Sequence, residues 1–246
     1  MTQAVFLHNK DAFEKILAHY QVSDHAKGLL KDINMVGLGG LAGGGRNTVI
    51  SYLVNNAHYH FIVSDTTRPP KLRNGVMEID GISYHFRNEE DMLHEIEAGE
   101  FLEAEVIHNQ QVSGVSIREL VNAHETGKIP IHDFEFGGLE NIYNAKPNAH
   151  IIGLLPPSYD EWIRRFTERE EISEQELLNR LRTAKEVLTR MLEKPYFKLV
   201  INDRIEQCAR DIREIVEQGN YASEKEAQCR QVAEDILQRV RAHLGA

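Results

Sequence analysis

A glycine-rich loop carries the clearest chemical signal in this sequence. Read from Gly40, it has the spacing G-x-x-x-x-G and continues with Arg46-Asn47, where a phosphate-binding P-loop has lysine followed by serine or threonine. The backbone N–H groups of such a loop point inward and bind phosphate oxygens, and the helix that follows adds the positive end of its dipole. We therefore expect a nucleotide phosphate to contact Gly40, Gly43, Gly44, Gly45, Arg46, Asn47 and Thr48.

The residues that end the loop determine which chemistry we expect there. Arg46 keeps the positive charge of the usual lysine, but its planar guanidinium is larger and binds in a fork rather than as a point charge. Asn47 replaces the usual Mg²⁺-binding hydroxyl with a carboxamide oxygen, which is a weaker ligand. Thr48 supplies a hydroxyl one position later.

The segments around the loop read as alternating strands and helices. An apolar strand at residues 33–38 leads into the loop, a helix opens near Thr48, and a second strand follows at 59–64. This order is typical of an α/β fold with a parallel sheet. We expect the sheet to resume at residues 128–135, 150–155 and 197–202.

Three regions depart from this alternation. Residues 65–118 combine turn residues with alternating apolar residues, which predicts an inserted lobe of short antiparallel strands and an acidic helix at 88–99. Residues 165–182 alternate arginine and glutamate and contain few apolar groups, as a mobile helical flap would. Residues 10–31 read as one or two short helices.

A helix from Ser223 onward carries one apolar stripe along its length. The stripe consists of Val232, Ala233, Ile236, Leu237, Val240 and Leu244. It could form a homodimer, but such a stripe more often packs within its own chain. We expect intramolecular packing here, with the N-terminal helix as a candidate partner.

Composition excludes several classes of protein. The net charge of −10 argues against binding to nucleic acid or to an anionic membrane, because neither polyanion is attracted to it. No apolar run approaches ~18 residues, and the first residues lack a basic segment followed by an apolar one, so we expect a cytoplasmic protein. Cys208 and Cys229 have no metal-ligand spacing and are expected to be reduced thiols.

Several motifs together resemble one known family. The segment from Phe61 to Pro70 is similar to the guanylate kinase signature S-x-T-T-R-x-P-R. The similarity continues, in the family's order and spacing, through Gly81–Phe86, Glu100–Glu103, Ile131–Gly138, Leu155–Ser158, the arginines of the flap and Val200–Asp203. It covers roughly residues 33–217.

The resemblance implies a fold and a division of the chain. The fold would be the three-layer α/β/α arrangement of P-loop NTPases, with a parallel sheet, an inserted GMP-binding lobe and a helical lid. Residues 1–31 would form an N-terminal helical extension and 218–246 a C-terminal helix. The guanylate-kinase-like domain would span 32–217, with the lobe at 62–118 and the lid at 158–190.

The resemblance also implies a role for individual residues. Arg46, Arg165, Arg169 and Arg180 would stabilise the transferred phosphoryl group, Asn202 would contact adenine, and Asn47 and Asp133 would hold Mg²⁺, Asp133 through water. Ser64, Glu103 and Glu135 would read guanine, whereas Arg68, Tyr84 and either Lys71 or Arg73 would bind the GMP phosphate. Ser113 stands in a segment where the family has a phosphate-binding tyrosine, and it would replace that tyrosine at the GMP phosphate. Without the resemblance, the flap arginines would read as a solvated helix with ion pairs to Glu168, Glu170 and Glu176.

These residues lead us to expect an enzyme that transfers the ATP γ-phosphate to GMP with Mg²⁺. Two alternatives remain. A guanylate-kinase-like module that binds a nucleotide or a phosphopeptide with weak or no catalysis would explain Arg46-Asn47 and the missing tyrosine. A kinase for a different acceptor would explain the rebuilt segments 69–84 and 109–116.

Overall fold

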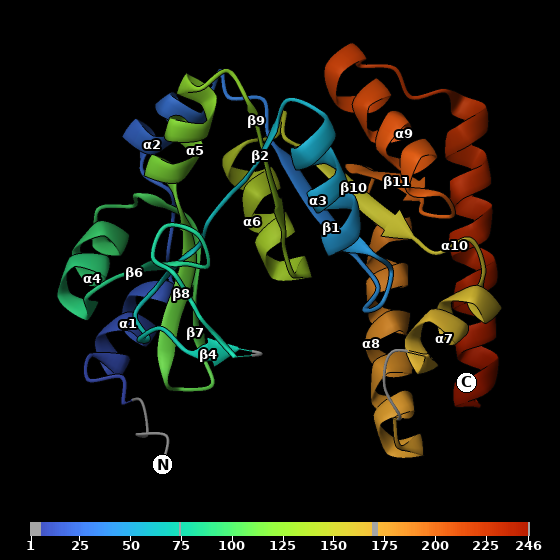
Figure 1. Ribbon diagram of the computed structural model, residues 1–246, viewed down its shortest axis with the longest axis horizontal. Helices are drawn as coiled ribbons and strands as arrows, with labels where there is room; N and C mark the ends of the chain where they lie inside the picture. The colour runs from blue at the N-terminus through green and yellow to red at the C-terminus, as the bar shows by residue number, and fades with distance from the viewer. Residues whose placement is uncertain (1–5, 74, 169–171, 246) are drawn as a thin grey trace. The chain divides into compact units, whose positions relative to one another are not determined.

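The largest sheet has five strands in the order β11-β10-β1-β9-β2 (Figure 1). Its strands are β1 (Val36–Gly40), β2 (Tyr59–Phe61), β9 (Ile129–Asp133), β10 (His150–Leu155) and β11 (Phe197–Ile201). β1 runs parallel to both β9 and β10, and β10 runs parallel to β11. The long buried runs in β1 and β10 are typical of a parallel sheet that is covered on both faces. The predicted α/β fold is confirmed.

The computed structural model describes residues 6–73, 75–168 and 172–245, and the chain divides into two compact units. The lobe unit contains the chain up to Ile33, together with His60–Pro130 and Asn144–Pro147. The sheet unit contains Asn34–Tyr59, Ile131–Tyr143 and the chain from Asn148 onward. The predicted N-terminal extension is thus grouped with the lobe, and the C-terminal helix with the sheet.

Helices lie on both sides of the strands in the sheet unit. α3 (Arg46–Asn56) packs against β1 and against α9 (Ile205–Gln218), which also contacts β10 and β11. α6 (Phe136–Ala145) places the ring of Phe136 at 5.2 Å from that of Phe197 on β11. α8 (Glu174–Glu193) also packs against β11 (Figure 1). This arrangement has the three layers that the sequence predicts.

The C-terminal helix α10 (Ser223–Leu244) packs inside the sheet unit, against α8, β10, β11 and α7 (Tyr159–Thr167). Four residues of its predicted stripe are buried there: Ala233, Ile236, Leu237 and Val240. Packing within the chain is therefore confirmed, but the N-terminal helix as its partner is wrong. Periodicity identified the buried face of α10 without identifying what covers it.

The lobe unit contains a second sheet with the order β6-β3-β8-β7 and a separate hairpin. The sheet strands are β3 (Asp65–Thr66), β6 (His85–Phe86), β7 (Phe101–Ile107) and β8 (Gln111–Ser116), and β4 (Leu72–Arg73) pairs with β5 (Val76–Met77). The antiparallel strands predicted here occur in β3–β8, β7–β8 and β4–β5, but β3 runs parallel to β6. The turns between β3 and β6 bring the chain back in the same direction as β3.

The described residues of the lobe unit also form four helices. They are α1 (Lys10–Leu17), α2 (Asp24–Leu30), α4 (Glu89–Glu97) and α5 (Ile117–Glu125). α1 packs on α4 and β7, where Phe13, Met92, Ile96 and Phe101 form a buried cluster. The hydroxyl of Tyr20 donates to the carbonyl of Phe101 at 2.6 Å and accepts from its N–H at 2.9 Å. The N-terminal helices therefore belong to the core of this unit.

The described chain has no helix that is both long and apolar enough to span a bilayer. Its two cysteines, Cys208 and Cys229, are buried free thiols, as expected. Burial raises the pKa of Cys208 to about 12.

The packing of α10 predicts the effect of truncating its stripe. Ile236 is 1% exposed, so Ile236→Ala should lower the free energy of unfolding by about 2–4 kcal/mol, through lost burial and a residual cavity. Urea denaturation measures this change. The exposed Glu234→Ala on the same helix is the control and should change stability by less than about 0.5 kcal/mol. Equal small losses for both variants would contradict the packing.

Candidate functional site

The glycine loop connects the end of β1 to the start of α3 in a tight backbone arrangement. The N–H of Gly44 donates to the carbonyl of Leu41 at 2.9 Å. Gly43 and Gly45 have φ values of +77° and +92°, which lie in the left-handed region that favours glycine. Gly45 is the N-cap residue of α3. Because glycine has no side chain, it cannot accept a hydrogen bond from the backbone N–H groups in the first turn of that helix. An anion is the natural partner for such groups.

Asn202, which follows β11, fixes the shape of this loop. Its Nδ2 donates to the carbonyl of Gly44 at 2.9 Å, and its backbone N–H donates to Leu155 at 2.7 Å. A Cβ atom on Gly45 would lie 2.3 Å from Nδ2 of Asn202, a distance that no side chain tolerates. Asn202, expected from the resemblance to contact adenine, is buried here and holds the glycine loop.

The loop forms one wall of a cavity of about 530 Å³ in the sheet unit. α3 and the two helices of the predicted lid supply the other walls. The lining residues are Leu41, Ala42, Gly43, Gly45, Arg46, Asn47, Thr48, Phe166 and Arg180. The structure therefore brings most of the expected ATP-site residues to one cavity.

Arg180 lines this cavity from α8. Its guanidinium stacks over the ring of Phe166 with 4.0 Å between Cζ and the ring centroid. Its Nε donates to Glu176 at 2.6 Å, which is the i,i+4 ion pair expected for a solvated helix. Arg180 therefore forms the ion pair of a solvated helix and lines the cavity at the same time.

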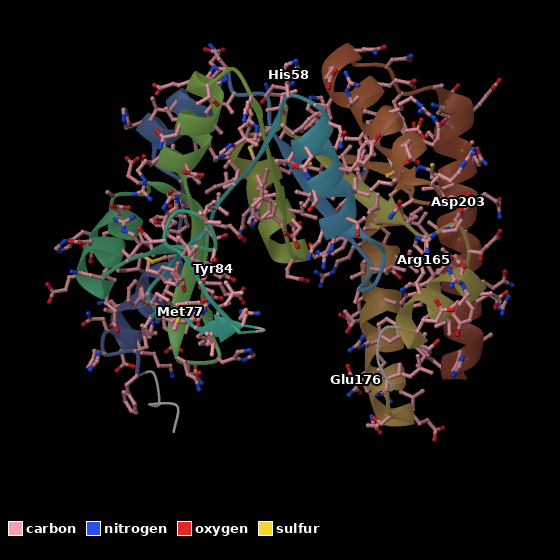
Figure 2. The ribbon with its side chains drawn as sticks, viewed as in Figure 1. His58, Met77, Tyr84, Arg165, Glu176 and Asp203 are labelled. Atoms are coloured by element: carbon pink, nitrogen blue, oxygen red, sulfur yellow. The ribbon has the colours of Figure 1, made fainter. Side chains whose placement is uncertain are left out.

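Arg165 has a different position on α7. Its Nη1 donates to the carbonyl of Asn202 at 2.7 Å and its Nε to Glu161 at 2.7 Å. Figure 2 shows Arg165 and Asp203 as neighbours, and Nη2 lies 3.5 Å from the carbonyl of Asp203. Arg165 therefore connects α7 to the end of β11 next to the loop. Arg169 lies outside the described residues.

Arg46 begins α3 and is mostly buried. Its Nη1 donates to the carbonyl of Phe134 at 3.4 Å, and its Nη2 lies 3.7 Å from the exposed carboxylate of Glu135. Asp133, the last residue of β9, pairs in register with Leu38 of β1, two positions before the loop. Glu135 therefore lies beside Arg46, and both Glu135 and Asp133 belong to the sheet unit.

The residues expected to bind the GMP phosphate meet at a carboxylate that the sequence did not single out. Arg68 is 2% exposed and makes two hydrogen bonds to Glu78, from Nη1 to Oε2 and from Nη2 to Oε1. Arg73 donates from Nε to Glu78 at 2.8 Å, and the backbone N–H of Lys71 donates to it at 3.0 Å. The guanidinium of Arg68 beside Glu78 is the main cause that lowers the pKa of this carboxyl to about 2.

Tyr84 lies over the other side of Arg68, with 4.7 Å between the guanidinium carbon and the ring centroid. Glu78 and the residues expected to bind the GMP phosphate, namely Arg68, Lys71, Arg73 and Tyr84, therefore form one cluster in the lobe unit. Little in the sequence indicated this cluster, because Glu78 stands ten residues after its main partner, Arg68, in a segment that differs from the family pattern.

The expected guanine-reading residues of the lobe lie on the second sheet. Ser64 comes just before β3, and its carbonyl accepts a hydrogen bond from His85. Glu103 lies on β7 opposite Val115 of β8. On β8, Ser113 donates its hydroxyl to Thr66 Oγ1 at 2.9 Å and accepts from Gln111 at 3.1 Å. Ser113 is therefore part of a polar side-chain network.

Sequence reasoning also missed two aromatic residues of the lid region. Trp162 is buried, and its Nε1 donates to the carbonyl of Ala42 in the glycine loop at 2.8 Å. Phe166, one turn later, lines the cavity. Their spacing on an amphipathic helix was the available signal, but it predicts only burial.

The packing of the loop predicts the outcome of adding one methyl group. Gly45→Ala places Cβ against Nδ2 of Asn202, so either this amide or the loop must move and the hydrogen bond to the carbonyl of Gly44 is disturbed. The affinity for ATP should therefore fall by at least about tenfold, or ~1.4 kcal/mol. Calorimetric titration measures the affinity. Gly219→Ala is the matched control, because Gly219 also has a positive φ, +63°, but a Cβ there would meet no atom of the described residues beyond its neighbours within 4 Å. Equal losses in both variants would show that backbone strain, not the contact with Asn202, is responsible.

The comparisons with known proteins all match the same family over the same part of the chain. A family model for guanylate kinase matches residues 34–219. The guanylate kinase of Corynebacterium diphtheriae is 34% identical over 184 residues, which are 74% of this chain and 93% of that protein. Guanylate kinase 1 of Arabidopsis thaliana is 31% identical over 182 residues, and the chain spans about half of its length (46%), as it does for its rice counterpart.

A crystal structure of guanylate kinase from Anaplasma phagocytophilum has the same fold. It superposes with a TM-score of 0.53 at 22% identity and covers 79% of this chain and 90% of its own. The family model covers most of this chain, and the bacterial relative aligns along nearly its whole length. The chain belongs to the guanylate kinase family.

Proposed function

We propose that the protein transfers the γ-phosphoryl group of ATP to GMP, giving ADP and GDP. The observation that carries this proposal is the cavity in which the glycine loop, Arg46 and Arg180 meet. Family membership supports it, since the curated relatives are named guanylate kinases. In the reaction, an oxygen of the GMP phosphate forms a bond to the γ-phosphorus while the bond from that phosphorus to the ADP oxygen breaks.

The sheet unit would bind ATP by its phosphates. The N–H groups of the glycine loop and the first turn of α3 would hold the β- and γ-phosphates. Arg46 and Arg180 would neutralise the charge that develops on the γ-phosphoryl group, which is the main catalytic requirement of phosphoryl transfer. Arg165 would position the loop through Asn202 rather than touch the phosphate.

Mg²⁺ fits the oxygen groups that line this cavity. The described residues contain no cluster of three histidine, cysteine or acidic side chains placed to hold a metal. Asn47 and Thr48 are exposed at the cavity, and Asp133 ends the neighbouring strand. Mg²⁺ commonly uses one or two such oxygens together with substrate phosphates. When bound there, it would neutralise phosphate charge.

The lobe unit would bind GMP. The carboxylate of Glu103 would accept two N–H donors of guanine, a pair that adenine lacks, and Ser64 would contact the neighbouring oxygen. Arg68, Arg73, Lys71 and Tyr84 would surround the GMP phosphate, and Ser113 would take the place of the family's tyrosine. Glu135, which belongs to the sheet unit, is the remaining residue proposed for guanine recognition. Residues 62–118 are accordingly the proposed GMP-binding lobe and 158–190 the proposed lid, between the terminal segments 1–31 and 218–246.

A second candidate function is a module that binds a nucleotide or phosphopeptide with little turnover. The observation that favours it is the pairing of Arg68 with Glu78, which engages a principal phosphate ligand. We prefer the enzyme because a phosphopeptide binder has no need for a lid arginine beside a glycine loop. We further propose that the enzyme acts in the cytoplasm in purine nucleotide metabolism, which its two free thiols support.

Replacing Arg46 tests the proposed mechanism. With ATP, Mg²⁺ and GMP, Arg46→Ala should lower kcat about 100-fold and change the KM for GMP less than about threefold, because Arg46 stabilises charge at the γ-phosphate. ADP release measures both constants. Arg210→Ala on the exposed side of α9 is the control and should keep wild-type rates.

Two outcomes would contradict the proposal. Equal losses in kcat and in GMP affinity would remove the role assigned to Arg46. If wild-type protein releases no ADP above background, the protein is not a GMP kinase. Calorimetric titration with ATP and with GMP separately would then identify a binding module.

A further inference from the structure

We propose that the C-terminal helix α10 positions the ATP site, and that Arg239 is its main positioning residue. Arg239 acts through α7 rather than on the substrate: it holds the start of α7, and α7 in turn holds the glycine loop. The inference rests on the proposed function, because that function assigns the cavity to ATP. The family match ends at residue 219, so the role falls to a helix that the match does not cover.

The first step is the attachment of α7 to the glycine loop. Trp162 of α7 donates from Nε1 to the carbonyl of Ala42 at 2.8 Å. Phe166, one turn later, lies so close to the loop that a Cβ on Gly43 would be 3.1 Å from its ring. Arg165 connects the same helix to the residue that follows β11. The position of α7 therefore sets the position of the loop.

The second step is that α7 needs a support outside itself. It has nine residues, Tyr159–Thr167, and isolated helices shorter than ~12–15 residues are marginal in water. The loop is a poor support, because the backbone of a glycine-rich segment adopts many conformations. In contrast, α10 has 22 residues and packs against α8, β10 and β11 as well as α7 (Figure 1). The firm support of α7 is therefore α10.

The third step is the contact between the two helices. Nη2 of Arg239 donates to Asp160 Oδ1 at 2.7 Å, and Nη1 lies 3.4 Å from Oδ2. The same guanidinium stacks over the ring of Tyr159, with 4.7 Å between Cζ and the ring centroid. One turn later on α10, Nδ1 of His243 lies 2.9 Å from the hydroxyl of Tyr159. Two side chains of α10 thus hold the first two residues of α7.

The fourth step is a continuous row of rings from Arg239 to the cavity. The ring of Tyr159 lies 6.1 Å from that of Trp162 in an edge-to-face arrangement, and Trp162 lies 6.3 Å from Phe166. Phe166 lines the cavity and carries the guanidinium of Arg180 over its face. All three rings are at most 9% exposed. Because packed interiors transmit displacement, a shift of Tyr159 reaches the phosphate site.

The fifth step separates positioning from folding. The side chains of Arg239 and Asp160 are 55% and 75% exposed, and such ion pairs add little to the stability of a fold. The packing of α10 depends on a different set of residues, which are buried: Ala233, Ile236, Leu237 and Val240. Removing Arg239 therefore leaves α10 in place and releases the start of α7.

Arg239→Ala removes the ion pair and the stacked guanidinium together. In this variant α7 samples further positions, and the apparent affinity for ATP falls by the fraction of molecules that keep the competent one. We expect the Kd for ATP in calorimetric titration to rise about fivefold, and the Kd for GMP to stay within about twofold of wild type. Arg239→Lys keeps the charge but loses the planar stack, so its Kd for ATP should lie between the two.

Arg241→Ala is the matched control. It removes the same charge from an exposed position on the same helix, and it should bind ATP and GMP like the wild type. Its midpoint in urea denaturation should equal that of Arg239→Ala. Unchanged ATP affinity in Arg239→Ala would overturn the proposal. Equal losses of ATP and GMP affinity together with a lower urea midpoint would overturn it as well, and would make Arg239 a residue of general stability.

Hydrogen–deuterium exchange gives a second readout that a purely structural role would not produce. Without nucleotide, the amides of α7 should exchange faster in Arg239→Ala than in wild type, while those of residues 233–240 in α10 should not. ATP should restore slow exchange in α7. Faster exchange throughout the sheet unit, or no change in α7, would contradict the positioning role.

Failure of the proposed function gives a different result. In that case ADP release is absent in the wild type, but the effect of Arg239→Ala on ATP affinity persists. If instead turnover is normal and Arg239→Ala binds ATP like Arg241→Ala, the enzyme stands and the positioning role of α10 does not.

Discussion

The side-chain amide of Asn202 lies against Gly45, in the space that a β-carbon at this position would need. The glycine loop and its connection to the sheet depend on this contact. Since Gly45 has no β-carbon, Nδ2 of Asn202 can approach the loop and hold the carbonyl of Gly44. The carbonyl of Asn202 in turn receives Arg165 from α7. One residue after β11 thereby connects the loop, the sheet and the first helix of the proposed lid. Close packing and the hydrogen bond from Asn202 fix the shape of the loop.

The C-terminal helix extends this network to a region beyond the family match. Arg239 of α10 pairs with Asp160 at 2.7 Å and stacks over the ring of Tyr159, whose hydroxyl lies 2.9 Å from Nδ1 of His243. These three contacts tie the start of α7 to α10. In the lobe unit, buried ion pairs connect the second sheet to its neighbouring segments, since Asp65 is fully buried and pairs with Arg87 and Arg118. Such pairs add little net stability, but removing one partner is costly.

The sequence was sufficient to predict most of what depends on local pattern. The order of strands and helices and the glycine loop followed from motifs whose spacing is set by backbone geometry, whereas a place for Arg180 at the nucleotide site was expected only from the family resemblance. The partner of α10 was wrong, because helical periodicity reports a buried face but not the surface against it. Glu78 was missed because its partners approach it through a rebuilt hairpin that no spacing rule describes. The roles of the individual site residues stay predictions.

The buried indole of Trp162 is an intrinsic fluorophore in contact with the glycine loop. It is the one tryptophan among 246 residues, its Nε1 donates to Ala42 inside the loop, and its ring lies near that of Phe166 in the cavity wall. Any rearrangement of loop or lid changes the hydrogen bond and the polarity around that ring. The fluorescence emission of the native protein therefore reports on the conformation of its glycine loop, without an added dye or an engineered residue.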